Sequence, residues 1–408
     1  MASSLNASTS GSGGVIVTSD ATGNLDIQSG GSTVVAVTST GVAVTGTLAA
    51  SGAVTLTGSL NAPNTFGFKN RIINGGMVID QRNAGASVTP TDGAYTLDRW
   101  RAGLSQVSKL SIQQNSGAVT PPSGFKNYLG VVSLSAYALT GSDVFMLQQK
   151  IEGYNVSDLM LGTASAATFT VSFWVRSSLT GLFGGSLINS AGDRSYPFSY
   201  TISIANTWEQ KSITVAGDTS GTWLTTTGSG LELRLSMGSS GTYLGTVNTW
   251  GAGNYASVTG ATSVVGTNGA TFYITGVQLE KGSTATSFDF RDYGRELIMC
   301  QRYLPAWSGL NSLGTGQSIG STNCRFNLPL PVTARVSPTG VSVSSAAHFA
   351  TNNSAGTNLT GTAVTFLNAG TLSAWFDISV ASGLTAGNAS QVFATSSSAL
   401  LYLTGCEL

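Results

Sequence analysis

The chain has 408 residues, of which only 9% are charged, and its 18 basic and 18 acidic residues leave no net charge. Soluble proteins usually carry about 25% charged residues. The hydrophobic fraction of 41% is nevertheless close to normal, which excludes an extended disordered chain. The basic residues are scattered, so the clustered Lys and Arg on which nucleic-acid binding depends are missing and no nucleic-acid partner is expected.

The sequence also predicts where the protein is made. No apolar run approaches the roughly 20 residues of a membrane span, so membrane insertion is not expected. Residues 1–14 are rich in Ser, Gly and Asn and lack the basic and apolar regions of a secretory signal. The three cysteines, at 300, 324 and 406, have no metal-binding spacing and are too few for a disulfide framework. We expect synthesis in a reducing cytoplasm. If the protein acts outside a cell, it must leave the cell by a route other than secretion.

Residues 1–66 are predicted to form a β-rich fibre segment. Gly, Ser, Asn and Asp separate short apolar runs typical of strands, at 15–18, 24–27, 33–37, 42–44 and 54–56. A weak repeat, VTGTL at 44–48 and LTGSL at 56–60, suits a β-coil whose turns stack. So short a segment buries little core alone, whereas winding three copies together would cover the apolar faces. A flexible Gly/Ser linker is the alternative, although linkers lack this density of Val.

Residues 67–303 are predicted to form a β-sandwich or jelly roll. Phe169, Val171, Phe173 and Val175 alternate with polar residues, and the same pattern recurs at 200–204 and 231–235. Many short strands broken by turn residues are typical of a sandwich or jelly roll.

Helix is expected in two places. Asn155 would cap a short turn over 156–161 that ends at Gly162, and 292–303 is the best helix candidate. In that helix the buried residues are expected to be Leu297, Ile298 and Met299, and the exposed ones Arg295, Glu296 and Arg302.

Residues 304–408 are predicted to form a smaller C-terminal β-sandwich, the tip, which makes the whole chain all-β. Pro at alternate positions of 327–332 fits an edge strand or an irregular segment. Later strands are expected at 371–380 and 399–408.

Several separated motifs resemble a widespread group of bacteriophage tail-fibre and receptor-binding proteins. The first is NRIINGGMVIDQRN at 70–83, in which Gly76 stands where that group has an acidic or polar residue. The others follow in the expected order: YTLDRW at 95–100, QKIEGY at 149–154, SFWVRS at 172–177, TGVQLEKG at 275–282 and CQRY at 300–303. The tip is less similar, through LPVTARVSPT at 330–339 and LTGCEL at 403–408.

The resemblance implies a homotrimeric virion protein. Its jelly roll would resemble carbohydrate-binding modules, and its N-terminal segment would attach to other virion proteins of the tail, baseplate, neck or capsid. Localisation in the virion also fits the missing signal, because phages assemble in the cytoplasm and leave by lysis.

Neither catalysis nor a cofactor is expected. A depolymerase needs two carboxylates about 5–10 Å apart across the scissile bond, and the tip contains only Asp377 and Glu407, on different predicted strands. The jelly-roll carboxylates fall largely in the shared motifs, where pairing with arginine explains them. The one group that such a fold could hold is a structural Ca²⁺, with Asp92 and Glu280 as candidate ligands.

Binding of a neutral polysaccharide is the favoured chemistry, because aromatic rings stack on sugar faces and amides and hydroxyls hydrogen-bond to them. A surface poor in charge suits such a ligand. The candidates are Tyr243, Trp250 and Tyr255, in a stretch rich in Gly and Asn, and Trp307, His348 and Trp375 in the tip. Packing in a core is the alternative for each of them. It is the favoured interpretation for Trp100, Trp174 and Trp208.

The sequence thus predicts a non-enzymatic, homotrimeric phage tail fibre that binds a host surface polysaccharide for adsorption. Weak contacts would be multiplied by threefold avidity. Two alternatives stay open. One is a structural capsid-decorating, head or neck fibre without a specific receptor, and the other is a surface polysaccharide depolymerase.

Overall fold

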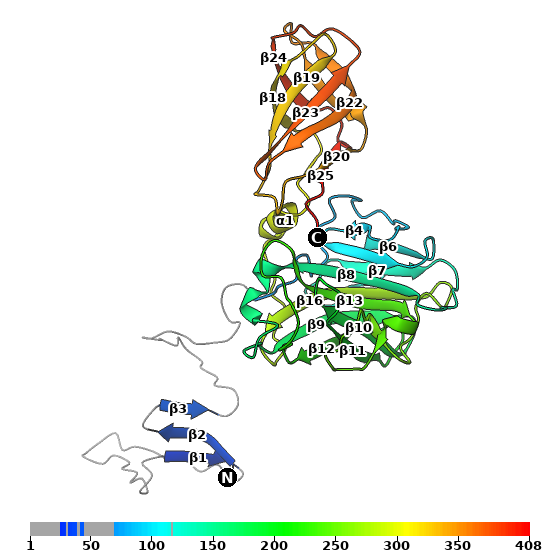
Figure 1. Cartoon of the computed structure of the whole chain (residues 1–408), viewed down its shortest axis with the longest axis vertical. Helices are drawn as coiled ribbons and strands as arrows, with labels where there is room; N and C mark the ends of the chain where they lie inside the picture. Colours follow the sequence, from blue (N-terminus) through cyan, green and yellow to red (C-terminus); the bar gives the residue numbers. More distant parts are fainter. Residues whose placement is uncertain (1–24, 30–31, 39–40, 45–68, 116) are drawn as a thin grey trace, which may run out of the picture. The chain divides into compact units, whose positions relative to one another are not determined.

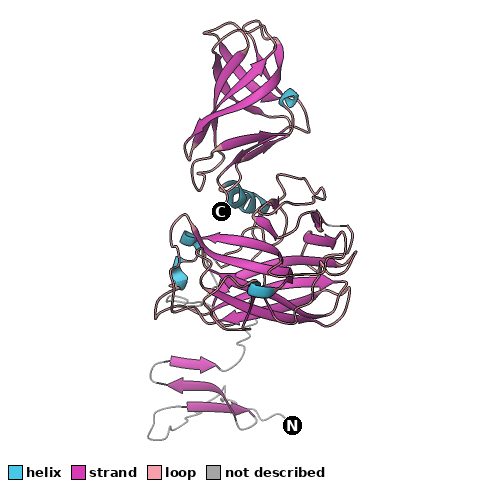
Figure 2. Cartoon of the chain, turned by 45° about the vertical axis from the view of Figure 1, so that its right-hand side comes forward, coloured by secondary structure: helices cyan, strands magenta, loops and turns pink. Residues whose placement is uncertain are grey.

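The computed structural model describes residues 25–29, 32–38, 41–44, 69–115 and 117–408. The chain divides into two compact units, Met1–Asn61 and Ala62–Leu408. Strands dominate both units (Figure 1) and the helices are short (Figure 2), which confirms the predicted β-rich class. No helix in the described ranges is long and apolar enough to span a membrane.

The first unit contains an antiparallel three-stranded meander of β1 (Leu25–Ser29), β2 (Ser32–Thr38) and β3 (Gly41–Val44). β2 and β3 confirm the strands predicted at 33–37 and 42–44. The strands predicted at 15–18 and 54–56 lie outside the described residues, as do 45–48 and 56–60 of the repeat. The winding of three copies stays a prediction.

The predicted jelly roll (hereafter the jelly roll) forms a sandwich of two antiparallel sheets. One has six strands in the order β11-β10-β13-β8-β5-β4, and the other has five in the order β12-β9-β16-β7-β6. The six-stranded sheet contains β4 (Tyr95–Leu97), β5 (Trp100–Leu104), β8 (Val144–Glu152), β10 (Gly181–Ile188), β11 (Ser195–Ile202) and β13 (Ser229–Ser239). The five-stranded sheet contains β6 (Leu110–Asn115), β7 (Tyr128–Ser133), β9 (Phe169–Ser177), β12 (Glu209–Val215) and β16 (Thr271–Lys281).

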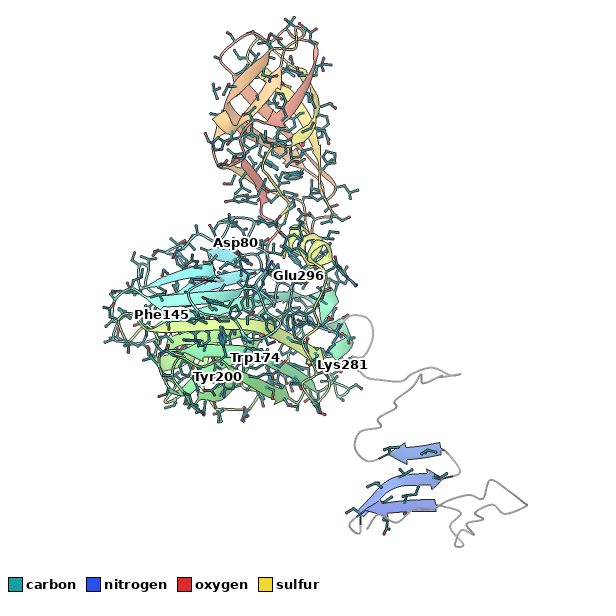
Figure 3. All side chains as sticks on the ribbon, turned by 180° about the vertical axis from the view of Figure 1, so that it is seen from behind. Asp80, Phe145, Trp174, Tyr200, Lys281 and Glu296 are labelled. Atoms are coloured by element: carbon teal, nitrogen blue, oxygen red, sulfur yellow. The ribbon has the colours of Figure 1, made fainter. Side chains whose placement is uncertain are left out.

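The two sheets share one hydrophobic core. The four alternating apolar residues predicted on one face of 168–176 are all fully buried in it. The ring of Phe173 on β9 meets that of Tyr200 on β11 with 5.1 Å between centroids, which joins the two sheets. Phe145 of β8 and Tyr200 are labelled in Figure 3, within the layers of the sandwich.

The helix predicted at 292–303 is α1 (Tyr293–Gln301), capped by the Asp292 side chain, which accepts from the Arg295 amide at 2.9 Å. Its predicted faces are partly wrong: Ile298 is 52% exposed, whereas Glu296 is only 7% exposed. The Glu296 carboxylate accepts a hydrogen bond from the Asn74 amide and pairs with Arg291, so two donors outside the helix account for its burial.

The short turn predicted over 156–161 forms as one 3₁₀ turn, η2 (Ser157–Leu159), and a further 3₁₀ turn, η1 (Gly153–Asn155), precedes it. The segment ends in left-handed backbone, with φ of 51° at Met160 and 82° at Gly162. Asn155 does not cap it, because it lies inside η1 and the residue at the cap of η2 is Val156.

The tip differs from the predicted sandwich. Six strands close into a barrel in the order β18-β19-β23-β22-β21-β24, beside a three-stranded sheet in the order β17-β25-β20. Strands in which apolar and polar residues alternate occur in barrels and in sandwiches alike. Closing the sheet into a barrel leaves no strand edge unpaired. The barrel strands are β18 (Ser312–Ser318), β19 (Asn323–Pro329), β21 (Phe349–Asn352), β22 (Asn358–Ala369), β23 (Ser373–Val380) and β24 (Ala389–Ala394). The small sheet contains β17 (Ala306–Ser308), β20 (Gly340–Val343) and β25 (Leu400–Thr404), and η4 (Ala346–His348) precedes β21.

The segment predicted as an edge strand or irregular stretch contains the end of β19, which pairs with β18 and β23. Pairing with β18 stops at Phe326, and Pro329 faces only Ser373 of β23. Proline has no backbone N–H to donate, and it lies where the pairing of β19 with β18 has already stopped.

Glu152, at the end of β8, connects the jelly roll to α1 and the residues after it. This carboxylate is 1% exposed. It accepts from Arg302 Nη2 at 2.6 Å, from Arg302 Nε at 2.9 Å and from the Tyr303 hydroxyl at 2.6 Å. Arg302 Nη1 also donates to the carbonyl of Thr333, at 3.2 Å. One buried carboxylate therefore ties the sandwich to the segment that leads into the tip.

Replacing Glu152 with Gln should lower the free energy of unfolding by about 2 kcal/mol, because the Arg302 guanidinium loses a charged partner in a buried setting. Denaturant unfolding of the full chain measures the change. Asp377→Asn is the matched control, since its pair with Arg325 lies at 2.9 Å on the barrel surface and exposed pairs contribute little. Equal losses in the two variants would contradict the role given to Glu152.

Asp98 should make stability depend on pH. Burial raises the pKa of Asp98 to about 6, although hydrogen bonds from the Gln81 side chain and backbone oppose the shift. The folded state therefore holds this proton more tightly than the unfolded state. The proton on Asp98 adds its full contribution to the free energy of unfolding below about pH 4. This contribution is lost as the pH rises through about 6, a change of roughly 3 kcal/mol.

Asp98→Asn should remove that component. The difference in unfolding free energy between the native protein and the variant is expected to fall between pH 4 and pH 7. Chemical denaturation at several pH values measures it, and parallel pH profiles would contradict the prediction.

Candidate functional site

A polar groove of about 490 Å³ lies on the face of the six-stranded sheet that points away from the sandwich core. Its floor is formed by β5, β8 and β13. Successive side chains of a strand point to opposite faces, so Leu147 of β8 enters the core whereas Gln148 faces the groove. On β13, Leu233 enters the core while Glu232 and Arg234 face the groove.

The register places these polar residues in rows across the strands. Gln148 lies opposite Arg101 on one side and opposite Arg234 on the other. Lys150, two residues further along β8, lies opposite Glu232. Directly opposite residues have Cβ atoms about 4.5–5.5 Å apart, so three cations, one amide and one carboxylate share a small area of the groove floor.

Gln148 is 2% exposed, and its amide makes no hydrogen bond within the described part of the chain. The absence of a side chain at Gly103 makes room for it. A Cβ at that position would lie 2.5 Å from Gln148 Nε2 and 2.7 Å from Met146 Cε. The groove therefore contains a buried amide with unused donors and acceptors, and buried amides usually have partners.

The charged groups of the floor differ in how they are paired. Arg234 Nε binds Glu232 at 2.6 Å, and Arg234 Nη1 donates to Asn254 at 2.5 Å. Arg101 Nε donates to the carbonyl of Gly93 at 3.1 Å. The Lys150 ammonium group has no hydrogen-bond or ion-pair partner among the described residues. Burial lowers the pKa of Lys150, and Arg101 and Arg234 add to the shift although Glu232 opposes it.

Loops form the walls of the groove. On one side the segment 241–258, with η3 (Gly241–Tyr243), β14 (Leu244–Gly245) and β15 (Ser257–Val258), folds over the sheet. It is held there by the Tyr255 carbonyl, which accepts from the Ser186 hydroxyl at 2.7 Å. Asn189, in the turn between β10 and β11, forms another part of the wall. Its side chain is fixed by Asp193 at 2.6 Å and by the carbonyl of Thr222 at 3.1 Å.

Of the three aromatic candidates predicted in the jelly roll, the structure brings one to this groove. Tyr243 lines its wall. Trp250 instead packs against the core: its ring lies 5.4 Å from that of Trp223, and its indole N–H donates to the carbonyl of Ala216. Tyr255 lies over the backbone of Gly245 and lines a separate groove of about 470 Å³.

The three tip candidates are not brought together into one site. Trp307 packs against the barrel core. His348 contacts the Ser344 hydroxyl through Nδ1 at 2.8 Å. Trp375 is 43% exposed and lines a shallow groove of about 420 Å³ with Arg325, Leu367 and Asn368.

The two calcium-ligand candidates do not form a site together. Glu280 lies in β16 of the five-stranded sheet. Its oxygens already accept from Gln278 Nε2 at 2.7 Å and from the Thr286 amide and hydroxyl at 2.9 and 2.6 Å. Asp92 lies beside the six-stranded sheet and accepts from the Leu104 amide at 2.9 Å. Over the described ranges, no three His, Cys, Asp or Glu residues are grouped in a way that suits a metal.

The floor of the groove was not predicted from the sequence. Charge is scarce in this chain, yet Lys150, Glu232 and Arg234 occur on strands whose other face is apolar. Charged residues on the outward face of strands whose inward face is apolar were the sequence feature that could have indicated this groove. The alternation predicts strands, whereas the predicted sugar contacts are mainly aromatic residues.

Glu232→Gln should lower the pKa of Lys150 further, because the carboxylate that favours the charged ammonium is removed. The NMR titration of ¹³C-methylated lysines measures this pKa. Glu209→Gln is the control, since Glu209 pairs with Lys211 on the other sheet. An unchanged titration of Lys150 in Glu232→Gln would show that the two groups do not interact.

Comparison with known proteins gives distant structural similarities only. No protein-family model and no curated protein matches the sequence. The enzymatically active domain of tailspike protein 4 from bacteriophage CBA120 is 12% identical with a TM-score of 0.30, over 52% of this chain and 21% of that one. A putative sugar-binding protein from Bacteroides thetaiotaomicron is 11% identical with a TM-score of 0.32, over 52% of this chain and all of that one. A family 11 carbohydrate-binding module from Clostridium thermocellum, in complex with a mixed-linked tetrasaccharide, is 14% identical with a TM-score of 0.25, over 49% and 98%.

Proposed function

We propose that the groove on the six-stranded sheet binds a segment of a polysaccharide. The observation that carries the proposal is Gln148, a buried amide without a partner at the centre of the floor. An amide offers two donors and an acceptor to sugar hydroxyls. The volume of about 490 Å³ falls within the 300–1,000 Å³ typical of small-ligand sites, and Tyr243 offers an aromatic ring at the wall.

Binding without hydrolysis is proposed. Both carboxylates of the groove already have protein partners. Glu232 forms an ion pair with Arg234, and Asp92 accepts a hydrogen bond from the Leu104 amide. Release of reducing ends from bound polysaccharide would contradict this part of the proposal.

Gln148→Leu should weaken oligosaccharide binding by about tenfold, the equivalent of one lost hydrogen-bonding group. Isothermal titration calorimetry of the full chain, with ligands identified on a glycan array, measures the affinity. Gln317→Leu is the matched control, because that glutamine is exposed on β18 of the barrel. Equal affinity in the native protein and Gln148→Leu would contradict the assignment of the groove.

We also propose that the chain is a homotrimeric fibre protein of a phage virion that contacts a host surface polysaccharide. The motifs between 70 and 303 support the phage assignment. The meander of the first unit supports assembly: Ile27, Val37, Val42 and Val44 are exposed and share one face through the register of β1, β2 and β3. The apolar face of a sheet must be buried against another layer, and copies of the same sheet would cover it.

Light scattering should give three times the mass of one chain. Val42→Asp should reduce the trimer fraction because it places a charge on the apolar face. Ala43→Asp, on the opposite face of β3, should not. A monomer for the native protein would contradict the proposed architecture, and antibody labelling of virions in electron micrographs would test the location.

A further inference from the structure

We infer that the saccharide taken by the groove carries an oxyanion, such as the carboxylate of a uronic acid, that is received by Lys150, Arg101 and Gln148. This inference rests on the proposed saccharide binding and specifies the class of sugar. It also departs from the expectation of a neutral polysaccharide that the charge-poor sequence suggests.

The first argument is the charge balance of the groove. Its side chains include three cations, Arg101, Lys150 and Arg234, and two carboxylates, Asp92 and Glu232. The Glu232 carboxylate is already ion-paired with Arg234, at 2.6 Å from Nε. In the described part of the chain, no carboxylate lies within the 4.0 Å of an ion pair from Lys150 or Arg101. The groove therefore contains two cationic groups without an ion-pair partner among the described residues.

The second argument is their arrangement. Arg101 lies directly opposite Gln148 across the β5–β8 pair, and Lys150 lies two residues from Gln148 on the same face of β8. Such positions are about 5 and 7 Å apart. One oxyanion above Gln148 can therefore accept from the ammonium, the guanidinium and the amide NH₂ together. Arg101 uses only Nε in a protein contact, which leaves its terminal N–H groups for a planar, bidentate contact with a carboxylate.

The third argument is the cost of the alternative. A neutral sugar covering the groove would remove water from two unpaired cations without replacing it by a charge, and burying an unpaired charge is strongly unfavourable. Burial lowers the pKa of Lys150 even though Glu232, opposite it on β13, favours the charged form, so this carboxylate does not offset the loss of water around the ammonium. An anionic ligand would supply a further negative charge.

The experiment compares ligands of matched backbone. The full chain is titrated with hexasaccharides of galacturonate, alginate and sulfated galactan, and with neutral galactan and glucan hexasaccharides, at 50 and 500 mM NaCl. For each uronate that binds, the fully methyl-esterified form is tested as well, since esterification removes the charge and keeps the backbone. We expect anionic ligands to bind at least about tenfold more tightly than their uncharged counterparts, and to weaken at high salt.

Variants connect the preference to the groove. Lys150→Gln should lower affinity for the anionic ligand by about tenfold while thermal stability is kept, and Lys150→Arg should restore most of it. Lys126→Gln makes the same change in charge at an exposed residue that lines a different cavity. It should leave the affinity unchanged, which separates a local contact from the net charge of the protein.

The possible outcomes separate the two proposals. Binding of neutral ligands only, or equal affinity for a uronate and its ester, would overturn the anionic preference and leave saccharide binding in place. Binding of no saccharide in either class would overturn both. Tight anionic binding that survives Lys150→Gln would overturn the assignment to these residues, and a preference for the sulfated ligand over the uronates would identify a sulfate ester as the oxyanion.

Discussion

The packing of β8 and β13 against the five-stranded sheet sets the position of the polar groups that these two strands contribute to the groove floor. Phe145 and Leu147 of β8, and Leu233 and Leu235 of β13, are fully buried between the sheets. Because side chains alternate across a strand, burial of this set forces the intervening residues to the other face. A shift of the register by one residue would place charges in the core. The core therefore determines where the groove chemistry lies.

β8 also connects the groove to the segment that leads into the tip. Gln148, Lys150 and Glu152 occupy the same face of that strand: the first two lie in the groove, and the third binds Arg302 and Tyr303. Arg99 adds a second connection, because its guanidinium donates to the carbonyl of Lys150 and lies 3.7 Å from the ring centroid of Tyr303. A single strand thus belongs to the core, the groove and the junction.

The sequence patterns predicted those parts of the fold that depend on interactions between residues close together in the chain. The alternation at 168–176 gave the buried face of β9, and Asp292 marked the start of α1. The barrel of the tip could not be told from a sandwich, because both need the same alternation. The reversed burial of Glu296 and Ile298 arose from Asn74 and Arg291, which belong to other segments.

The candidate site was harder to predict because it depends on pairing between distant segments. Gln148 becomes a groove residue through its opposition to Arg101 and Arg234, and no local pattern encodes that register. Trp250 was chosen for its loop-like surroundings, but it packs against Trp223. Large aromatic residues contribute to cores and to binding surfaces alike, so the charges on alternating strands were the more specific signal.

The small space above Gly103 has a consequence for how this groove can diversify. A Cβ there would meet the ends of both the Gln148 and Met146 side chains, so the residues at 103, 146 and 148 are coupled. A larger residue at 103 would have to displace both side chains or be accompanied by shorter ones. Related chains with different ligand preferences should therefore differ at these three positions together, while the framework beneath them stays the same.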